Sequence, residues 1–96
     1  MLIEKSITTG DVVSLKLTSG EELIARYEGE DDLTIKLDKP LQLVAGGKSL
    51  GMMPWFFLGS TDIVKVNKMA IAAGPVLSKK DAAAQYLEGT TGIALS

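Results

Sequence analysis

Side chains that could carry chemistry are few in this sequence, and the commonest catalytic ones are missing. The 96 residues include no cysteine and no histidine. This composition excludes a thiol nucleophile, an imidazole base, a Cys/His zinc site and a disulfide framework. We therefore predict a protein that is not an enzyme and that holds neither a metal nor a cofactor.

Four carboxylates crowd one short segment, at Glu28, Glu30, Asp31 and Asp32. A calcium loop of the EF-hand type spreads its ligands over about 12 residues and closes with a glutamate, and that spacing is absent here. Paired carboxylates that work as acid and base need two different environments within one pocket. We interpret the segment as a solvated turn.

A Gly-Lys-Ser triplet, typical of phosphate-binding loops, lies within Gly46-Gly47-Lys48-Ser49. The complete motif needs a further glycine where this chain has Gln42, and a helix after the triplet. The residues that follow, Leu50-Gly51-Met52-Met53-Pro54, are no start to a helix. The pattern favours a flexible glycine-rich loop over residues 44–51.

The lysines are scattered along the chain and do not form a run. With 10 basic and 12 acidic residues the net charge is −2, so there is no general attraction to nucleic acid and any binding must be local. Lys36 and Lys65 fall on outward positions of two different predicted strands. They would converge into a basic patch if copies of the chain assemble; otherwise they are ordinary surface lysines.

Apolar and polar residues alternate at a period of two through most of the first three quarters of the chain, which predicts strands. Asp38-Lys39-Pro40 is expected to break or bulge one of them, because proline has no backbone donor. Five strands joined by short turns predict a small antiparallel barrel. The expected strands are residues 13–17, 23–28, a long bent strand over 33–43, 52–58 and 63–69.

The fourth of these strands is apolar on both faces and holds Trp55, Phe56 and Phe57, three of the five aromatic residues. A strand with two apolar faces is buried on both sides. Aromatic side chains bury much area per residue, so we interpret this cluster as core or subunit interface in preference to a base-stacking platform.

The composition changes after Gly74-Pro75. Ser78 and Asp81 fit a helix start, the alanines that follow favour helix, and Gly89 is a natural stop. We predict a helix at residues 79–88 that docks through Ala83, Tyr86 and Leu87, since about three turns are marginal alone. The chain is thus divided into a barrel domain, residues 1–75, and a C-terminal helix with an apolar tail, residues 76–96, docked on the barrel or on a neighbouring subunit.

Two motifs follow one another within residues 12–67. The first comprises Gly20, Leu23, Ala25, Tyr27 and Gly29, and an acidic turn and an apolar strand follow it. The second, Leu58 to Val66, is a strand, a glycine turn and a strand. This pattern resembles the Sm/LSm family, which includes bacterial Hfq, and in particular the small Sm-like proteins of marine bacteriophages. The resemblance implies an all-β, five-stranded, strongly bent antiparallel barrel of the SH3 type, assembled as a cyclic homo-oligomer of about five to seven copies, such as a pentamer.

The resemblance has departures. The base-contacting asparagine of the family falls at Thr34, its basic residue before the second glycine falls at Leu58, and the lysine–histidine pair of Hfq has no counterpart. The candidate nucleic-acid-binding residues are Asp32, Thr34, Lys36, Gly59, Ser60 and Lys65. The candidate interface residues between subunits are Met53, Trp55, Phe57, Ile63, Lys65 and Asn67.

Two functions remain open at this point. The first is a non-enzymatic ring that binds single-stranded RNA or DNA and takes part in nucleic-acid processing. The second is a phage structural or assembly protein that uses the barrel only to oligomerise. No signal peptide or membrane span is visible, so we expect a soluble cytoplasmic protein, in the host cytoplasm if the chain is of phage origin.

Overall fold

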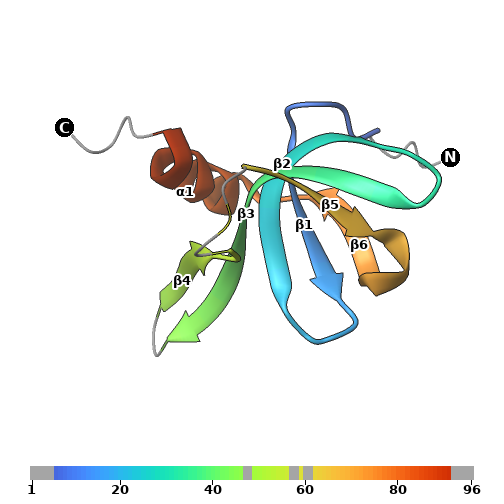
Figure 1. Ribbon diagram of the computed structural model, residues 1–96. Helices are drawn as coiled ribbons and strands as arrows, with labels where there is room; N and C mark the ends of the chain where they lie inside the picture. Colours follow the sequence, from blue (N-terminus) through green and yellow to red (C-terminus); the bar gives the residue numbers. More distant parts are fainter. Residues whose placement is uncertain (1–5, 47–48, 57–58, 60–61, 92–96) are drawn as a thin grey trace, which may run out of the picture.

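The computed structural model describes residues 6–46, 49–56, 59 and 62–91, and it is built mostly of strands (Figure 1). One antiparallel sheet has six strands in the order β4-β3-β2-β1-β6, with β5 also paired to β3. The strands are β1 (Val12–Leu17), β2 (Glu22–Glu30), β3 (Thr34–Gly46), β4 (Ser49–Pro54), β5 (Ile63–Asn67) and β6 (Ile71–Leu77). A 3-10 turn (Lys68–Ala70) joins β5 to β6, and helix α1 (Lys80–Thr91) follows. The mostly antiparallel β fold and the short C-terminal helix are confirmed, whereas the sheet has six strands where we predicted five and does not close.

Strand β3 is long because it serves two partners in turn. Its first part, Thr34–Asp38, pairs with β5, and its second part, Leu41–Gly46, pairs with β4. Between the two parts the register against β2 shifts by one residue, and Lys39 has a φ of +48°. The bulge predicted at Asp38-Lys39-Pro40 is therefore confirmed. It lets one continuous strand bend and change partners.

The β3–β4 hairpin projects from the body of the molecule (Figure 1). The glycine-rich segment over residues 44–51, which we interpreted as a flexible hairpin loop, does form a hairpin, but it is paired where we expected loop, since Val44 pairs with Gly51 and Gly46 pairs with Ser49. Strand β4 also ends at Pro54, so the predicted strand over 52–58 is displaced toward the N-terminus. Glycines lower the propensity of a segment to form a strand, but they do not prevent pairing. Here the segment forms strands because it pairs across the hairpin.

Strand β6 was missed by the sequence analysis, which continued the preceding strand to residue 69. The side chain of Asn67 accepts a hydrogen bond from the backbone N–H of Met69 at 2.8 Å and so begins the 3-10 turn that ends β5. The residues of β6 include no charged side chain and no alternation of apolar and polar residues. They pack closely along β1. At Gly74, φ is +98° and an added Cβ would lie 2.9 Å from the carbonyl oxygen of Ser14.

The main core lies on the inner side of the bent sheet. Its buried members come from β1, β2, β3 and β5, and they sit at the alternating positions that the pattern of period two predicts. They are Val13, Leu15, Leu17, Leu23, Ala25, Tyr27, Ile35, Leu37 and Val66. Side chains at the intervening positions of these strands point to the outer side of the sheet.

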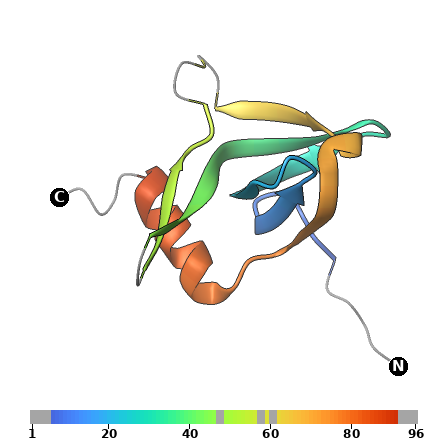
Figure 2. The same ribbon diagram turned by 90° about the horizontal axis from the view of Figure 1, so that it is seen from below.

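Helix α1 covers part of that outer side and lies beside β4 (Figure 2). Ile24 and Tyr86 are fully buried but stand outside the main core. The Tyr86 hydroxyl accepts a hydrogen bond from the backbone N–H of Arg26 at 3.1 Å and donates to the carbonyl oxygens of Asp38, at 2.6 Å, and Lys39, at 3.0 Å. The hydroxyl thus ties helix α1 to β2 and to the bulge of β3. Among the described residues, no helix is long and apolar enough to cross a membrane.

Candidate nucleic-acid interface

The two lysines singled out in the sequence lie directly opposite each other. Strands β3 and β5 are antiparallel, and their register pairs Lys36 with Lys65. The next position on the same outer side pairs Thr34 with Asn67. Directly opposed residues have Cβ atoms roughly 5 Å apart, so a single subunit already brings the bases of the two lysine side chains together, without the assembly that we expected to be needed.

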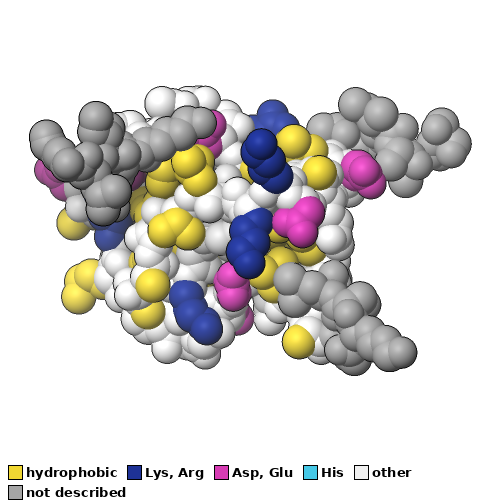
Figure 3. Space-filling model, turned by 180° about the vertical axis from the view of Figure 1, so that it is seen from behind, with side chains coloured by type: hydrophobic (Ala, Val, Ile, Leu, Met, Phe, Trp, Pro, Cys, Tyr) yellow, Lys and Arg dark blue, Asp and Glu magenta, His cyan; other side chains and the backbone are white. Residues whose placement is uncertain are grey.

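Neither lysine of this pair forms an ion pair within the described part of the chain, although the charge of Lys65 acts on Asp31. The ion pairs there join Lys39 to Asp38 and Asp62, and Lys68 to Glu30. Like charges directly opposite each other in a sheet are destabilising. On the side of the molecule that Figure 3 shows, basic and acidic side chains are interleaved with apolar ones, so positive charge does not form one broad patch there.

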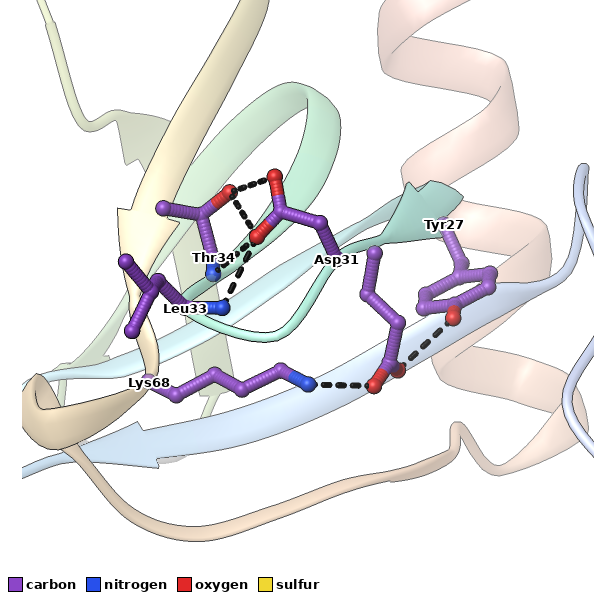
Figure 4. A network of polar contacts seen from close by, with 6 residues as sticks. Tyr27, Asp31, Leu33, Thr34 and Lys68 are labelled. Atoms are coloured by element: carbon purple, nitrogen blue, oxygen red, sulfur yellow. Dashed lines mark hydrogen bonds and ion pairs between the residues drawn. The ribbon is translucent and has the colours of Figure 1, made fainter.

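The acidic turn between β2 and β3 is built around Asp31 (Figure 4). Its carboxylate accepts hydrogen bonds from the backbone N–H of Leu33 at 2.9 Å and of Thr34 at 2.7 Å, and both of its oxygens lie 3.1 Å from the Thr34 hydroxyl. The two backbone hydrogen bonds, with a smaller contribution from the charge of Lys65, lower the pKa of Asp31. The Thr34 hydroxyl, a candidate ligand for nucleic acid, therefore donates its proton within the turn.

Lys68 fastens this turn to the 3-10 turn after β5 (Figure 4). Its Nζ lies 2.7 Å from Glu30 Oε2, and its backbone N–H donates to the Leu33 carbonyl oxygen at 2.8 Å. Tyr27 donates its hydroxyl proton to Glu30 at 2.8 Å. These contacts, the Lys68 hydrogen bond first, lower the pKa of Glu30. One of the four carboxylates of the acidic segment is thus already paired with a cation.

The remaining candidates for nucleic-acid contact are spread over two places. Asp32 is exposed in the acidic turn, next to the Thr34–Asn67 pair. Gly59 lies before the start of β5 and lines a separate pocket. Ser60 is outside the described residues. The acidic turn therefore contacts the 3-10 turn at Lys68. The candidate residues taken from the resemblance included Gly59, which lies in a different turn.

The candidate interface residues fall on three different elements. Met53 is exposed on β4, while Ile63 and Asn67 are exposed on β5. Trp55 is half-buried against the main core, and its indole N–H donates to Glu21 at 3.3 Å, so much of its surface is already used within the subunit. Phe57 lies outside the described residues.

Lys68 and Lys39 are charged residues at the site that the sequence analysis did not select. Lys68 follows Asn67, whose side chain begins the 3-10 turn. An asparagine at the end of an alternating strand favours a turn, so the sequence Asn67-Lys68 could have indicated a lysine in a turn. Lys39 was recognised only as part of a bulge. Its Nζ lies 3.5 Å from Asp62 Oδ2 and 3.8 Å from Asp38 Oδ2. These residues lie at the end of the β3–β5 ladder, beyond the lysine pair.

Three strands, β4, β5 and β6, each pair on one side only within the described residues. Strand β6, Ile71–Leu77, has no charged side chain along its length. Edge strands in natural proteins are usually shielded by charge, by a bulge or by a neighbour. The open edges of β5 and β6 are therefore candidates for pairing with another chain.

The site is described by the side chains that it brings together. No group of three metal-ligating side chains comes together within the part of the chain that the structure describes. The site offers ammonium groups, an amide and backbone turns, which suit anions. No protein-family model matches the sequence, and no curated protein matches it.

Proposed function

We propose that this chain is a non-enzymatic Sm-like ring protein that binds single-stranded RNA or DNA on the outer face of β3 and β5, with a role in nucleic-acid processing. The observation that carries the proposal is the opposition of Lys36 and Lys65, neither of which forms an ion pair with a described carboxylate. A phosphate group between the two ammonium groups would turn a repulsive pair into an attractive one. Each phosphate contact also releases condensed counterions.

The ring is supported by the strand order and the open edges. The chain passes from β5 through a 3-10 turn into β6, which returns to pair with β1, an order consistent with the small barrel that the resemblance implies. Pairing the free edge of β5 with the free edge of β6 in a neighbouring copy would satisfy both edges, and repeating that contact closes a ring. Cyclic symmetry then repeats the lysine pair, so a strand that touches several subunits gains avidity.

The test is fluorescence anisotropy with labelled single-stranded oligonucleotides over a salt series, together with the mass of the protein in solution. We expect an oligomer of about five to seven copies that binds at low salt and weakens steeply as salt rises. The double variant Lys36→Gln/Lys65→Gln should lose binding. The matched control, Lys79→Gln/Lys80→Gln, removes the same charge from an exposed site before and at the start of α1 and should bind nearly as the unmodified protein does.

A second function is favoured by one observation, the uncharged open edge of β6. A phage structural or assembly protein would use this edge to oligomerise and would have no need of nucleic acid. A stable ring that fails to bind any single-stranded RNA or DNA at low salt would support this second function. A monodisperse monomer at micromolar concentration would contradict both.

A further inference from the structure

A pocket of about 300 Å³ opens where β3 bends, β4 ends and α1 ends. Much of its wall is apolar and comes from three strands, with Pro40 and Leu41 from β3, Pro54 from β4 and Val64 from β5. Phe56 completes the wall, and 53% of its surface is exposed. Apolar hollows on the surface of a protein are typical binding sites, so this pocket is a candidate docking surface.

The wall of the pocket is held in place by contacts within the subunit. Val64 packs against the main core. The Trp55 ring meets Phe56 edge-on, with the ring centroids 5.0 Å apart and the planes at 62°. Gly59 passes so close that an added Cβ would lie 3.4 Å from the Phe56 Cβ. An apolar side chain that enters the pocket therefore meets a preformed surface, which lowers the cost of docking.

The rim of the pocket carries one cation and one carboxylate that face each other. Lys39 Nζ lies 3.5 Å from Asp62 Oδ2, and the Lys39 backbone N–H donates to the Asp62 carbonyl oxygen at 2.7 Å. Because the two charges oppose each other, the rim gives no net attraction to a charged group. The pocket thus favours an apolar and uncharged occupant.

Helix α1 brings the chain's own C-terminal segment to this pocket. Gly89 and Thr90, from the last turn of the helix, line it. Tyr86, one turn earlier, is 1% exposed and binds the bulge of β3, so the place of the helix end beside the pocket is fixed. The tail, residues 92–96, begins directly after α1 and lies outside the described residues. Three residues of extended chain span about 10 Å, so Ile93 is within reach of the pocket that Thr90 lines.

The sequence of the tail matches the chemistry of the pocket. Residues 89–96 include no charged side chain, and Ile93 and Leu95 are large and aliphatic. Residues two apart in an extended segment face the same side, so both side chains can enter together. A cavity of roughly 150 Å³ holds a benzene ring, so the pocket has room for branched aliphatic side chains. Gly92 follows the helix, and glycine there lets a chain turn back sharply.

We infer that the pocket beside Phe56 is the docking site of the tail of the same subunit, and that Ile93 and Leu95 fill it. The sequence analysis expected the tail to dock on the barrel or on a neighbouring subunit, and the pocket gives that expectation a place. Docking ties the end of α1 to β3, β4 and β5 and so adds a second attachment to the one at Tyr86. The inference does not rest on nucleic-acid binding, so its test is separate from that of the proposed function.

The first experiment uses disulfide cross-linking, which is clean here because the sequence has no cysteine. Asp62→Cys/Leu95→Cys places one thiol on the rim of the pocket and the other on the tail, and the bond forms only where the two Cα atoms come within about 7 Å. The control, Glu88→Cys/Leu95→Cys, places the first thiol on the exposed side of α1. An undocked tail would react at least as fast in the control, because the shorter loop closes more readily.

We expect the rim pair to oxidise about tenfold faster than the control or more, because docking raises the effective concentration of the tail at the pocket. The bond should form within one chain, so the mass under non-reducing conditions should not change. Equal rates in the two variants would overturn the docking. A doubled mass would overturn it as well, by showing that the tail of a neighbouring copy fills the pocket.

Trp55 supplies a second readout, since it is the only tryptophan in the sequence and its ring touches the aromatic wall of the pocket. Ile93→Ser/Leu95→Ser should move its emission to longer wavelength and lower Tm by about 5 °C or more, because water then reaches the pocket. The matched control, Leu33→Ser/Met69→Ser, changes two aliphatic side chains that are 72% and 88% exposed and should alter neither value. Unchanged emission and Tm in the tail variant would overturn the inference.

Discussion

The outer side of the sheet has a covered half and a bare half, and strand β3 belongs to both. Over β2 and the bulge of β3, Ile24 is fully buried and Tyr86 is 1% exposed beneath α1. Two residues before Asp38, whose carbonyl oxygen Tyr86 binds, the same face carries Lys36 opposite Lys65. Helix α1 covers the half that holds Ile24 and the bulge of β3, where Tyr86 contacts the Asp38 and Lys39 carbonyl oxygens. The half that holds the Lys36–Lys65 pair is not covered by the helix and is open to an anion.

Removal of the Tyr86 side chain should separate the two halves most clearly. Tyr86→Ala leaves a large void between α1 and the sheet and should lower the free energy of unfolding by about 3–5 kcal/mol. Chemical denaturation measures this loss, and Glu88→Ala on the exposed side of the same helix is the control. Oligonucleotide binding by the folded fraction should persist, because the lysine pair lies outside the covered half. A loss below about 1 kcal/mol would show that the helix contributes little to the fold.

The hydroxyl alone should have a smaller effect with its own pH signature. Tyr86→Phe leaves the Arg26 N–H and two carbonyl oxygens without their partner, which costs about 1–3 kcal/mol. Burial raises the pKa of Tyr86 from 10.0 to about 12. Because the folded-state value is the higher one, this contribution is complete below pH 10 and is lost as pH rises toward 12. Stability measured across that window should fall more steeply for the unmodified protein than for the variant, and parallel curves would contradict the role of the hydroxyl.

On the bare half, stability and binding should change in opposite directions. Lys65→Glu replaces a like-charged cross-strand pair by an oppositely charged one, which should raise the free energy of unfolding by about 0.5–1 kcal/mol. The same change should abolish oligonucleotide binding, because phosphate then meets a carboxylate. Thermal unfolding and anisotropy on one preparation test both. A destabilised protein would mean that the two side chains do not interact across the strands.

The smallest effect is expected at the turn that borders the bare half. Glu30→Gln removes the charge that Lys68 faces, and an exposed ion pair of this kind contributes about 0–1 kcal/mol. The Lys68 hydrogen bond holds the pKa of Glu30 below its usual value of 4.5, so its contribution is present above that pH and is lost as pH falls below it. Acid unfolding curves of the two proteins should converge in this range, and curves that stay apart would place the effect elsewhere.

The sequence predicted those parts of the molecule that one local pattern determines. Val13, Leu15 and Leu17 alternate with polar residues and form a strand, Lys39-Pro40 forms the bulge, and the alanine-rich segment forms the helix. Strand β6 could not be read, because Gly74 reflects close packing against β1 and not a local preference. The opposition of Lys36 and Lys65 depends on the register between two strands, which pairs residues 29 positions apart in the sequence.

The Tyr86 hydroxyl also affects amide hydrogen exchange in the centre of the sheet. The Arg26 amide lies in the middle of β2, where Arg26 pairs with Asp38 of β3, and it donates to a side chain of α1, the Tyr86 hydroxyl. An amide exchanges with solvent when its own acceptor leaves, and helices held by few contacts open more readily than the strands beneath them. The Arg26 proton should therefore exchange at the rate at which α1 lifts away, earlier than its neighbours in the same strand. One amide in a central strand thus records the motion of a helix at the opposite end of the sequence.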